Sequence, residues 1–255
     1  MNIERKVAIV TGGSSGLGQA TAERILAAGG RVAIFDIDRQ RGQAFAEAHA
    51  GKAIHIDVDV VLEESVRAGI RATLDAFGAI HICVNCAGVG QPRRASVHDT
   101  HSAAEFTRIL QLHLVGTYNV TRLAGAQMMD NEPLARSGER GVIVNTAALD
   151  AQHNGSNQLA YSACTAGVAG MTRPLTLAMS TYGIRVCAIM PGVFDTPFKA
   201  NLSPDARASL VTASRFPKRE GDPAEFAALV GHIIENPYLN GEVIRLDGGA
   251  HPPSR

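Results

Sequence analysis

The chain of 255 residues is long enough for one large α/β domain or two small ones. Its composition is 45% hydrophobic and 19% charged, which allows a substantial buried core. Lysine plus arginine and aspartate plus glutamate each total 24, so the formal net charge is zero. This balance gives no overall electrostatic attraction to nucleic acid or to an anionic membrane.

The apolar segments are too short to cross a membrane. Residues 1–6 lead directly into an apolar strand, and no apolar run reaches the roughly 18 residues of a membrane-spanning helix. No signal peptide is recognised either. We therefore expect a soluble, cytoplasmic protein that binds neither nucleic acid nor membrane.

Short apolar segments alternate with amphipathic ones along the whole chain. In chain order, the pattern predicts strands at 6–10, 31–36, 52–59, 81–87, 141–147, 184–190 and 241–247, and helices at 17–29, 39–49, 62–77, 102–130, 158–182 and 222–235. The strands show little polar alternation, which is typical of a parallel sheet covered on both faces.

This alternation predicts the α/β class, with a seven-stranded parallel sheet in a doubly wound Rossmann fold. No linker or repeat divides the chain, so a single domain spanning residues 1–255 is expected. Residues 131–140 are predicted to form a surface loop. Residues 191–220 contain four prolines after the sixth strand, where a substrate lid would lie.

A glycine-rich turn, TGGSSGLG at 11–18, connects the first strand to the first helix. Glycines at 12, 16 and 18 allow the backbone to turn tightly and to approach a pyrophosphate, which the helix N–H groups then face. Because strand, turn, helix and second strand follow in order, the turn predicts a dinucleotide site. An ordinary βα turn is the alternative.

Asp36 ends the second strand, about 20 residues after the glycine turn. A carboxylate at this position accepts hydrogen bonds from ribose hydroxyls and repels a 2′-phosphate. Although Arg39 and Arg41 follow, the acidic residue at the strand end favours NAD over NADP. Asp36 is alternatively a helix cap or turn residue.

Cys83 and Cys86 form a C-x-x-C pair, which raises redox or metal chemistry as alternatives. Residues three apart on a strand face opposite sides of the sheet, and no second pair of ligands follows. We expect buried, reduced thiols and no metal site.

Several of these segments together resemble the short-chain dehydrogenase/reductase family. They are the glycine turn, Asp59–Val60, NCAG at 85–88, Tyr161 and PGVFDTP at 191–197. The similarity covers essentially the whole chain. It is most detailed toward the type 2 3-hydroxyacyl-CoA dehydrogenase (type 10 17β-hydroxysteroid dehydrogenase) branch, in GVIVNTA at 141–147, GDPAEF at 221–226 and 233–248.

The resemblance implies NAD-dependent oxidation of an alcohol on an acyl-CoA or another hydrophobic hydroxy substrate, in a tetramer. It also implies which residues bind the cofactor. They are Gly12, Ser15, Gly16, Leu17, Gly18, Asp36, Asp59, Val60, Asn85, Cys86, Ala87, Gly88, Phe194 and Thr196.

Only one of the family's four catalytic groups is present. Tyr161 occupies the position of the general acid/base tyrosine. Thr165 stands where the family has the lysine that lowers the tyrosine pKa and holds the nicotinamide ribose. Ala148 replaces the serine that polarises the carbonyl, and His113 replaces the asparagine that supports a proton-relay water.

These replacements predict a severe loss of activity. An unperturbed tyrosine titrates at about pH 10, so without a nearby cation little phenolate exists at pH 7. Losing one donor to a developing oxyanion costs on the order of 10²–10³ in rate. His113, or Asp150 with His153, are candidates for replacement chemistry, against packed or surface roles for the same residues.

Three functions follow from these observations. The first is a degenerate subunit that partners an active homologous subunit in an NAD-dependent hydroxyacyl-CoA dehydrogenase heterotetramer, with NAD binding weakened or lost; a homotetramer of this chain alone is the alternative assembly. The second is an active dehydrogenase with altered catalytic residues. The third is a non-catalytic dinucleotide-binding regulator. Small residues in the helix at 158–182 allow close approach of a partner helix, although core packing also explains them.

Overall fold

Seven parallel strands form one sheet in the order β3-β2-β1-β4-β5-β6-β7. This computed structural model describes residues 1–89, 102–148, 159–197, 211–212 and 214–250. The strands are β1 (Val7–Thr11), β2 (Arg31–Phe35), β3 (Ala53–Ile56), β4 (Ile82–Asn85), β5 (Gly141–Thr146), β6 (Ile184–Pro191) and β7 (Val243–Leu246). The doubly wound Rossmann-type fold predicted from the sequence is confirmed.

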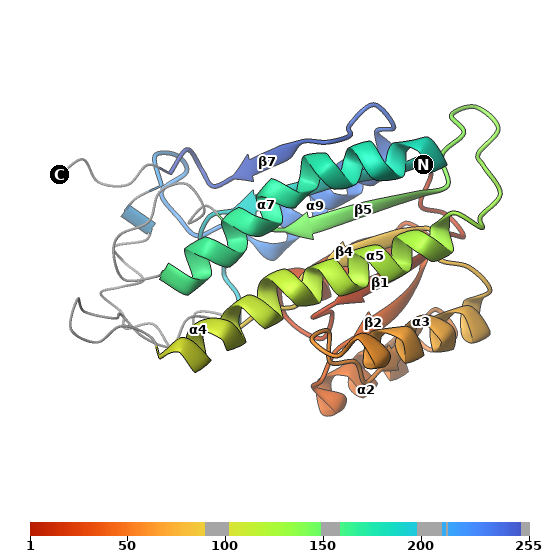
Figure 1. Ribbon diagram of the computed structural model, residues 1–255, viewed down its shortest axis with the longest axis horizontal. Helices are drawn as coiled ribbons and strands as arrows, with labels where there is room; N and C mark the ends of the chain where they lie inside the picture. The colour runs from red at the N-terminus through yellow and green to blue at the C-terminus, as the bar shows by residue number, and fades with distance from the viewer. Residues whose placement is uncertain (90–101, 149–158, 198–210, 213, 251–255) are drawn as a thin grey trace.

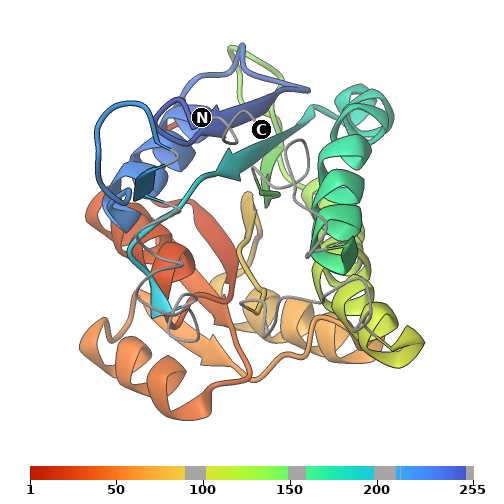
Figure 2. The same cartoon turned by 90° about the vertical axis from the view of Figure 1, so that its left-hand side faces the viewer.

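Helices cover both faces of the sheet (Figures 1 and 2). One face carries α1 (Gly16–Ala27), α2 (Arg39–Ala48) and α9 (Pro223–Glu235), while the other carries α3 (Glu63–Phe77), α4 (Ala103–Leu110), α5 (Gly116–Met128) and α7 (Leu159–Met179). None of the helices in the described residues is long and apolar enough to span a membrane.

The alternation of side chains along β1 explains why both faces are covered. All five residues of β1 are buried. Ala8 and Val10 pack with the α1 and α9 side of the core, whereas Ile9 packs with the α3 and α5 side. Successive strand residues point to opposite faces, so a strand that is apolar throughout requires a helix layer on each side.

The predicted helix at 102–130 is not continuous. A π-helical turn, η1 (Gln111–Val115), separates α4 from α5. The extra residue of a π turn changes the direction in which the following side chains point, and such turns are frequent at functional sites. The apolar periodicity of the segment does not distinguish this insertion from a regular helix, so the sequence predicts one long helix.

The segment before β5 is mostly exposed, but Glu139 within the predicted surface loop is buried. Its carboxylate accepts a hydrogen bond from Arg185 Nε at 2.8 Å, and the guanidinium also donates to the backbone carbonyls of Ile233, Ile234 and Leu239. This buried pair connects β6 with the end of α9 and with the segment before β5.

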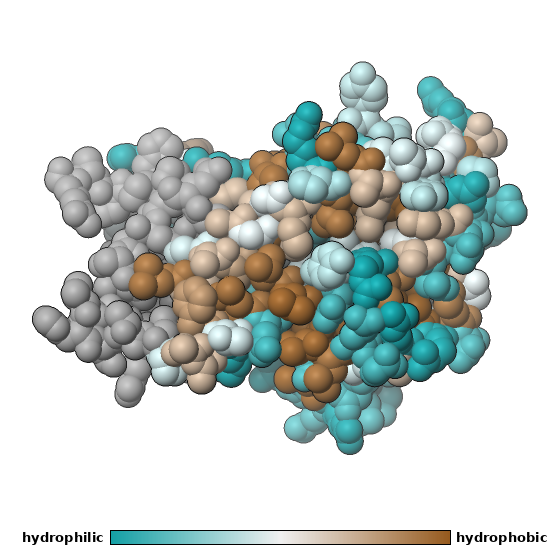
Figure 3. Space-filling model, in the orientation of Figure 1, coloured by the Kyte–Doolittle hydropathy of each residue, from teal (hydrophilic) through white to brown (hydrophobic). Residues whose placement is uncertain are grey.

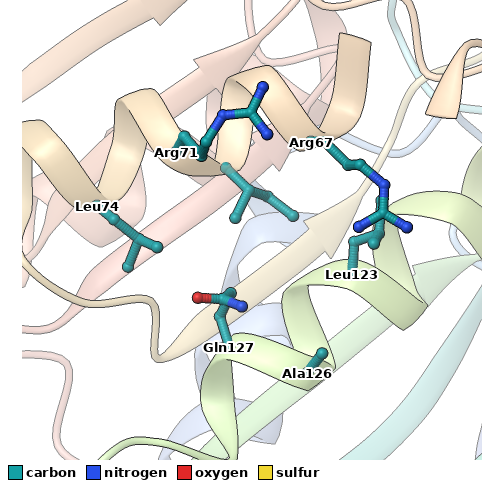
Figure 4. A pocket seen from close by; sticks show the side chains of 7 residues that line it. Arg67, Arg71, Leu74, Leu123, Ala126 and Gln127 are labelled. Carbon is teal, nitrogen blue, oxygen red and sulfur yellow. The ribbon is translucent and has the colours of Figure 1, made fainter. Parts of the chain in front are cut away.

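A hollow between α3 and α5 lies outside the predicted site. Arg67 and Arg71 of α3 line it together with Leu123, Ala126 and Gln127 of α5, and Figure 4 shows the Arg67 side chain extending toward Leu123 while Arg71 lies along α3. The guanidinium of Arg67 already bonds the Glu63 carboxylate of its own helix. We therefore interpret the hollow as a surface feature of helix packing.

Replacing Arg185 with methionine should destabilise the fold strongly, because the buried Glu139 carboxylate then loses its guanidinium partner and keeps the Met1 ammonium, at 3.2 Å, as a counter-charge. We expect a loss of about 3–5 kcal/mol in the free energy of unfolding, measured by urea titration. Arg219→Met is the matched control, since Arg219 pairs with Glu225 at the surface. Similar unfolding midpoints for the two variants would contradict the stabilising role assigned to the buried pair.

Candidate functional site

The glycine-rich turn lies at the carboxyl end of β1, packed tightly against neighbouring backbone. Gly12 has φ +62°, and a Cβ there would lie 3.0 Å from Cα of Ala87. A Cβ on Gly18 would collide with the carbonyl of Gly12. Only glycine fits these two positions, and the resulting turn leaves the N-terminus of α1 accessible to a ligand.

Asp36 follows β2 directly and is held in place by the turn. Its Oδ2 accepts hydrogen bonds from the Ser14 hydroxyl at 2.5 Å and the Ser14 N–H at 3.1 Å. Its Oδ1 accepts one from the Asp38 N–H at 3.0 Å. A carboxylate oriented in this way beside the glycine turn is suited to accept bonds from ribose hydroxyls.

The two arginines that follow Asp36 are each paired with a carboxylate. Arg39 contacts Oδ2 of Asp57 at 2.5 Å, and Arg41 contacts Oδ2 of Asp38 at 3.4 Å. Both pairs are solvent-exposed and therefore weak, so the preference for NAD rests on the Asp36 carboxylate itself.

Asp59 and Val60 lie in the segment between β3 and α3. The Asp59 side chain is exposed and accepts a hydrogen bond from the Val61 N–H at 3.0 Å, while Val60 is buried. The Asn119 side chain of α5 donates to the carbonyl of Val60 at 3.1 Å. These bonds fix the segment beside the neighbouring strand ends.

The NCAG segment continues from β4, next to the glycine turn. The Thr11 hydroxyl accepts hydrogen bonds from the backbone N–H groups of Cys86 at 3.1 Å and Ala87 at 3.0 Å. The buried Asn85 side chain donates to Asn145 Oδ1 of β5 at 2.8 Å. Asn85 thus belongs to the structural support beneath the site.

The remaining residues that the resemblance assigns to the cofactor lie in different surroundings. Ser15 is the N-cap residue of α1, and its side chain makes no capping bond. Leu17 packs against the core on the α1 side. Thr196 lies beside Gly16, because a Cβ on that glycine would be 3.2 Å from the Thr196 methyl group. The Phe194 ring instead packs edge-on against Phe226 in the core.

Tyr161 and Thr165 lie one turn apart on α7. Thr165 is only 2% exposed, and its hydroxyl donates to the carbonyl of Tyr161 at 2.8 Å. This donor is therefore bound within its own helix and carries no charge that could replace a lysine ammonium. The half-buried Tyr161 ring packs near Ile109 and Leu114.

His113 lies in the π turn and packs against both the Tyr161 ring and the NCAG segment. The two rings are edge-on, with centroids 5.3 Å apart. The Val89 N–H donates to His113 Nε2 at 3.4 Å, and a Cβ on Gly88 would collide with the imidazole. Burial lowers the pKa of His113 to about 4, so the ring is neutral at pH 7.

The other candidate residues also offer little catalytic chemistry. Ala148 is buried and carries no hydroxyl. Burial raises the pKa of the Cys83 and Cys86 thiols to about 12, which keeps both protonated. Among the described residues no cluster of potential metal ligands occurs. Asp150 and His153 lie outside the described residues.

Sequence reasoning missed the residues that support the predicted ones. Ser14 orients Asp36, and Asp57 binds Arg39, yet neither was singled out. The position of Asp57 depends on strand pairing, because Phe35 lies opposite Ile56 and the next residues are therefore neighbours. Asp57 could have been identified from the sequence only with a correct prediction of the register between β2 and β3.

The sheet order changes direction between β1 and β4, and the glycine turn and the NCAG segment lie at this point. A switch point of this kind, with an acidic residue after β2, defines a dinucleotide-binding α/β protein. The comparisons with known proteins narrow the class further.

A family model described as short chain dehydrogenase matches residues 6–207. The 3-hydroxyacyl-CoA dehydrogenase type-2 of Drosophila melanogaster is 43% identical over 249 residues, which cover 96% of this chain and 97% of that protein. Its Homo sapiens counterpart is 41% identical over 250 residues, covering 97% and 95%. The crystal structure of the Mycobacterium avium type-2 enzyme matches with a TM-score of 0.91 and 36% identity, covering 98% and 97%. The chain belongs to the short-chain dehydrogenase family.

The low pKa of His113 gives a prediction for stability against pH. An unfolded histidine binds its proton near pH 6.5, whereas folded His113 does so near pH 4, so the unfolded state holds more protons in this interval. Stability should therefore fall as pH drops from about 6.5 toward 4. The half-buried His81, whose pKa is also lowered to about 4 by partial desolvation, adds to the same fall.

In the variant His113→Asn this fall should be smaller than in the wild type but still present, because His81 remains. Urea unfolding at pH 7 and pH 4.5 measures the difference. An equal loss of stability in the two proteins would contradict the buried, neutral state assigned to His113.

Proposed function

We propose that this chain is a catalytically degenerate subunit that partners an active homologous subunit in an NAD-dependent hydroxyacyl-CoA dehydrogenase. The observation that carries the proposal is the hydrogen bond from the Thr165 hydroxyl to the Tyr161 carbonyl. It binds the side chain that stands at the lysine position into its own helix, where a threonine carries no charge, and Ala148 removes the second polar group of the site.

The relatives support the reaction class. The Drosophila and human relatives, which the chain matches over nearly its full length, are named 3-hydroxyacyl-CoA dehydrogenases. A cofactor of NAD type would supply hydride acceptance, and the glycine turn with Asp36 would hold its adenosine and pyrophosphate. Thr165, which stands at the position of the family's lysine, carries no charge.

The magnitude of the loss favours a non-catalytic role over slow catalysis. Removing an oxyanion donor costs on the order of 10²–10³ in rate, and loss of an effective general base costs about 10²–10⁴. These factors need not multiply, since groups that act as a unit are not additive. Either factor alone reduces a typical turnover of about 10 per second to about 0.1 per second or less, and the two together reduce it further.

His113 gives little support to the alternative of altered chemistry. Its Nε2 already accepts a bond from the Val89 N–H, so the proton of the neutral ring resides on Nδ1. With a pKa of about 4, the imidazole is also too weak a base to take a proton from an alcohol at neutral pH.

A partner surface is available on the helices of the α5 and α7 face. Ala163, Ala166, Gly170 and Leu177 of α7 are exposed and spaced three, four and seven residues apart, so they form one stripe. Figure 3 shows apolar residues gathered over this face. Small residues on such a stripe allow a second helix to approach closely, as in a homologous tetramer.

Among heteromers of this kind, the losses in this chain resemble those of the degenerate subunit in 2-[hydroxy(phenyl)methyl]succinyl-CoA dehydrogenase of anaerobic toluene breakdown. This substrate is the most specific one to assay, beside simple 3-hydroxyacyl-CoA esters.

The decisive experiment compares the isolated chain with a complex containing a homologue that has intact serine, tyrosine and lysine. NAD reduction is followed with both classes of hydroxyacyl-CoA. We expect no measurable turnover from this chain alone, and turnover in the complex that stops when the partner's tyrosine is replaced. Ordinary turnover by the isolated chain would refute the proposal.

Restoring the missing groups tests whether degeneration is confined to them. The double variant Ala148→Ser/Thr165→Lys should gain at least about 100-fold in NAD-dependent turnover over the isolated wild type, whereas each single variant gains much less. Circular dichroism confirms that the variants fold, and Thr165→Lys is the critical change because it supplies the cation. If the double variant folds but gains no activity, further catalytic groups must be missing elsewhere in the site.

A further inference from the structure

The two ends of the dinucleotide site differ in the groups that the chain provides for binding a ligand. We propose that this site recognises the adenosine diphosphate half of its ligand and gains no affinity from the nicotinamide half. The ligand class is adenosine 5′-diphosphates without a 2′-phosphate, so ADP, ADP-ribose and NAD should bind about equally. This deepens the proposed function, since it rests on the dinucleotide site that the degenerate subunit retains.

The adenosine end is complete and pre-organised. Asp36 is held by three hydrogen bonds, two from Ser14 and one from the Asp38 N–H. The adjoining segment at Val60 is fixed by Asn119. A carboxylate that is already oriented loses little conformational freedom when it binds a ribose, so this end keeps its contribution to affinity.

The pyrophosphate end is also prepared for an anion. Side-chain oxygens of Asp38, Ser102 and Asp222 cap α2, α4 and α9 respectively. In contrast, Ser15 makes no such bond at α1, and the first turn of α1 contains no acidic residue. The N–H groups of α1, next to the glycine turn, therefore have no competitor from the Ser15 side chain for a diphosphate.

At the nicotinamide end, two of the described side chains, Thr165 and His113, are not available to a ligand in this way. The Thr165 hydroxyl donates to the Tyr161 carbonyl and is closed off by burial. The His113 ring fills the space between Gly88 and Tyr161, and its Nε2 is already engaged by Val89. A second ribose and a nicotinamide ring therefore gain no donor from the Thr165 hydroxyl or from Nε2 of His113.

The charges beside Asp36 decide the preference at the 2′ position. Asp38 and Asp57 each pair with an arginine, so within the described part of the chain the Asp36 carboxylate carries the charge that faces the ribose position. A 2′-phosphate would approach this carboxylate and be repelled by it, and Arg39 and Arg41 would have to leave their own carboxylate partners to offset the repulsion.

The test is isothermal titration calorimetry of the isolated full chain with ADP, ADP-ribose, NAD and NADP. We expect dissociation constants for the first three that agree within about threefold, and NADP binding that is weaker by about tenfold or more. NAD binding about tenfold tighter than ADP would overturn the proposal, as would an absence of ADP binding at millimolar concentration.

Variants separate the two ends. Asp36→Asn should weaken ADP, ADP-ribose and NAD by the same factor, with thermal melting used to show that the variant is folded. Glu47→Gln, on the exposed surface of α2, is the matched control and should change none of them. Ala148→Ser/Thr165→Lys should tighten NAD and leave ADP unchanged, and equal effects on both ligands would overturn the division into two ends.

These measurements also distinguish failure of the inference from failure of the proposed function. Ligand binding is measured on the chain alone and without turnover, whereas the subunit role is judged by catalysis with and without the partner. Preferential NAD binding by a chain that is silent alone and active in the complex would refute this inference only.

Discussion

The hydroxyl of Thr11 joins the two strands between which the sheet changes direction. By accepting the N–H groups of Cys86 and Ala87, it fixes the end of β4 to the end of β1. The close contact between Gly12 and the backbone of Ala87 depends on this arrangement. The glycine turn, the position of Asp36 and the path of the NCAG segment are all set around this junction.

Stability and chemistry are carried by different residues in this chain. Ala148 and Thr165 are buried, and the Thr165 hydroxyl has a hydrogen-bond partner, so the replacements leave neither an unpaired charge nor an unsatisfied donor at these positions. A lysine at position 165 would need a partner for its charge in a buried place. The altered site is thus compatible with a stable fold, which explains how the architecture persists without the catalytic groups.

The sequence predicted the fold well because its strands and turn have local causes. The apolar runs of β1, β4 and β5 and the glycines at 12 and 18 follow from side-chain burial and backbone freedom. The support of the site could not be predicted in the same way, because Ser14 and Asp57 act on residues that are distant in sequence. The π turn was missed since one inserted residue hardly disturbs an apolar pattern.

That π turn allows the two parts of one long helical segment to pack against different neighbours. Before it, α4 packs with the start of α7 around Ile109 and Cys164, and after it α5 packs onto the sheet through Val120 and Ala124. A regular α-helix would present one continuous face to both the start of α7 and the sheet. The insertion therefore lets two otherwise incompatible packing surfaces share one uninterrupted backbone, and removing a single residue there would force one of them to turn toward solvent.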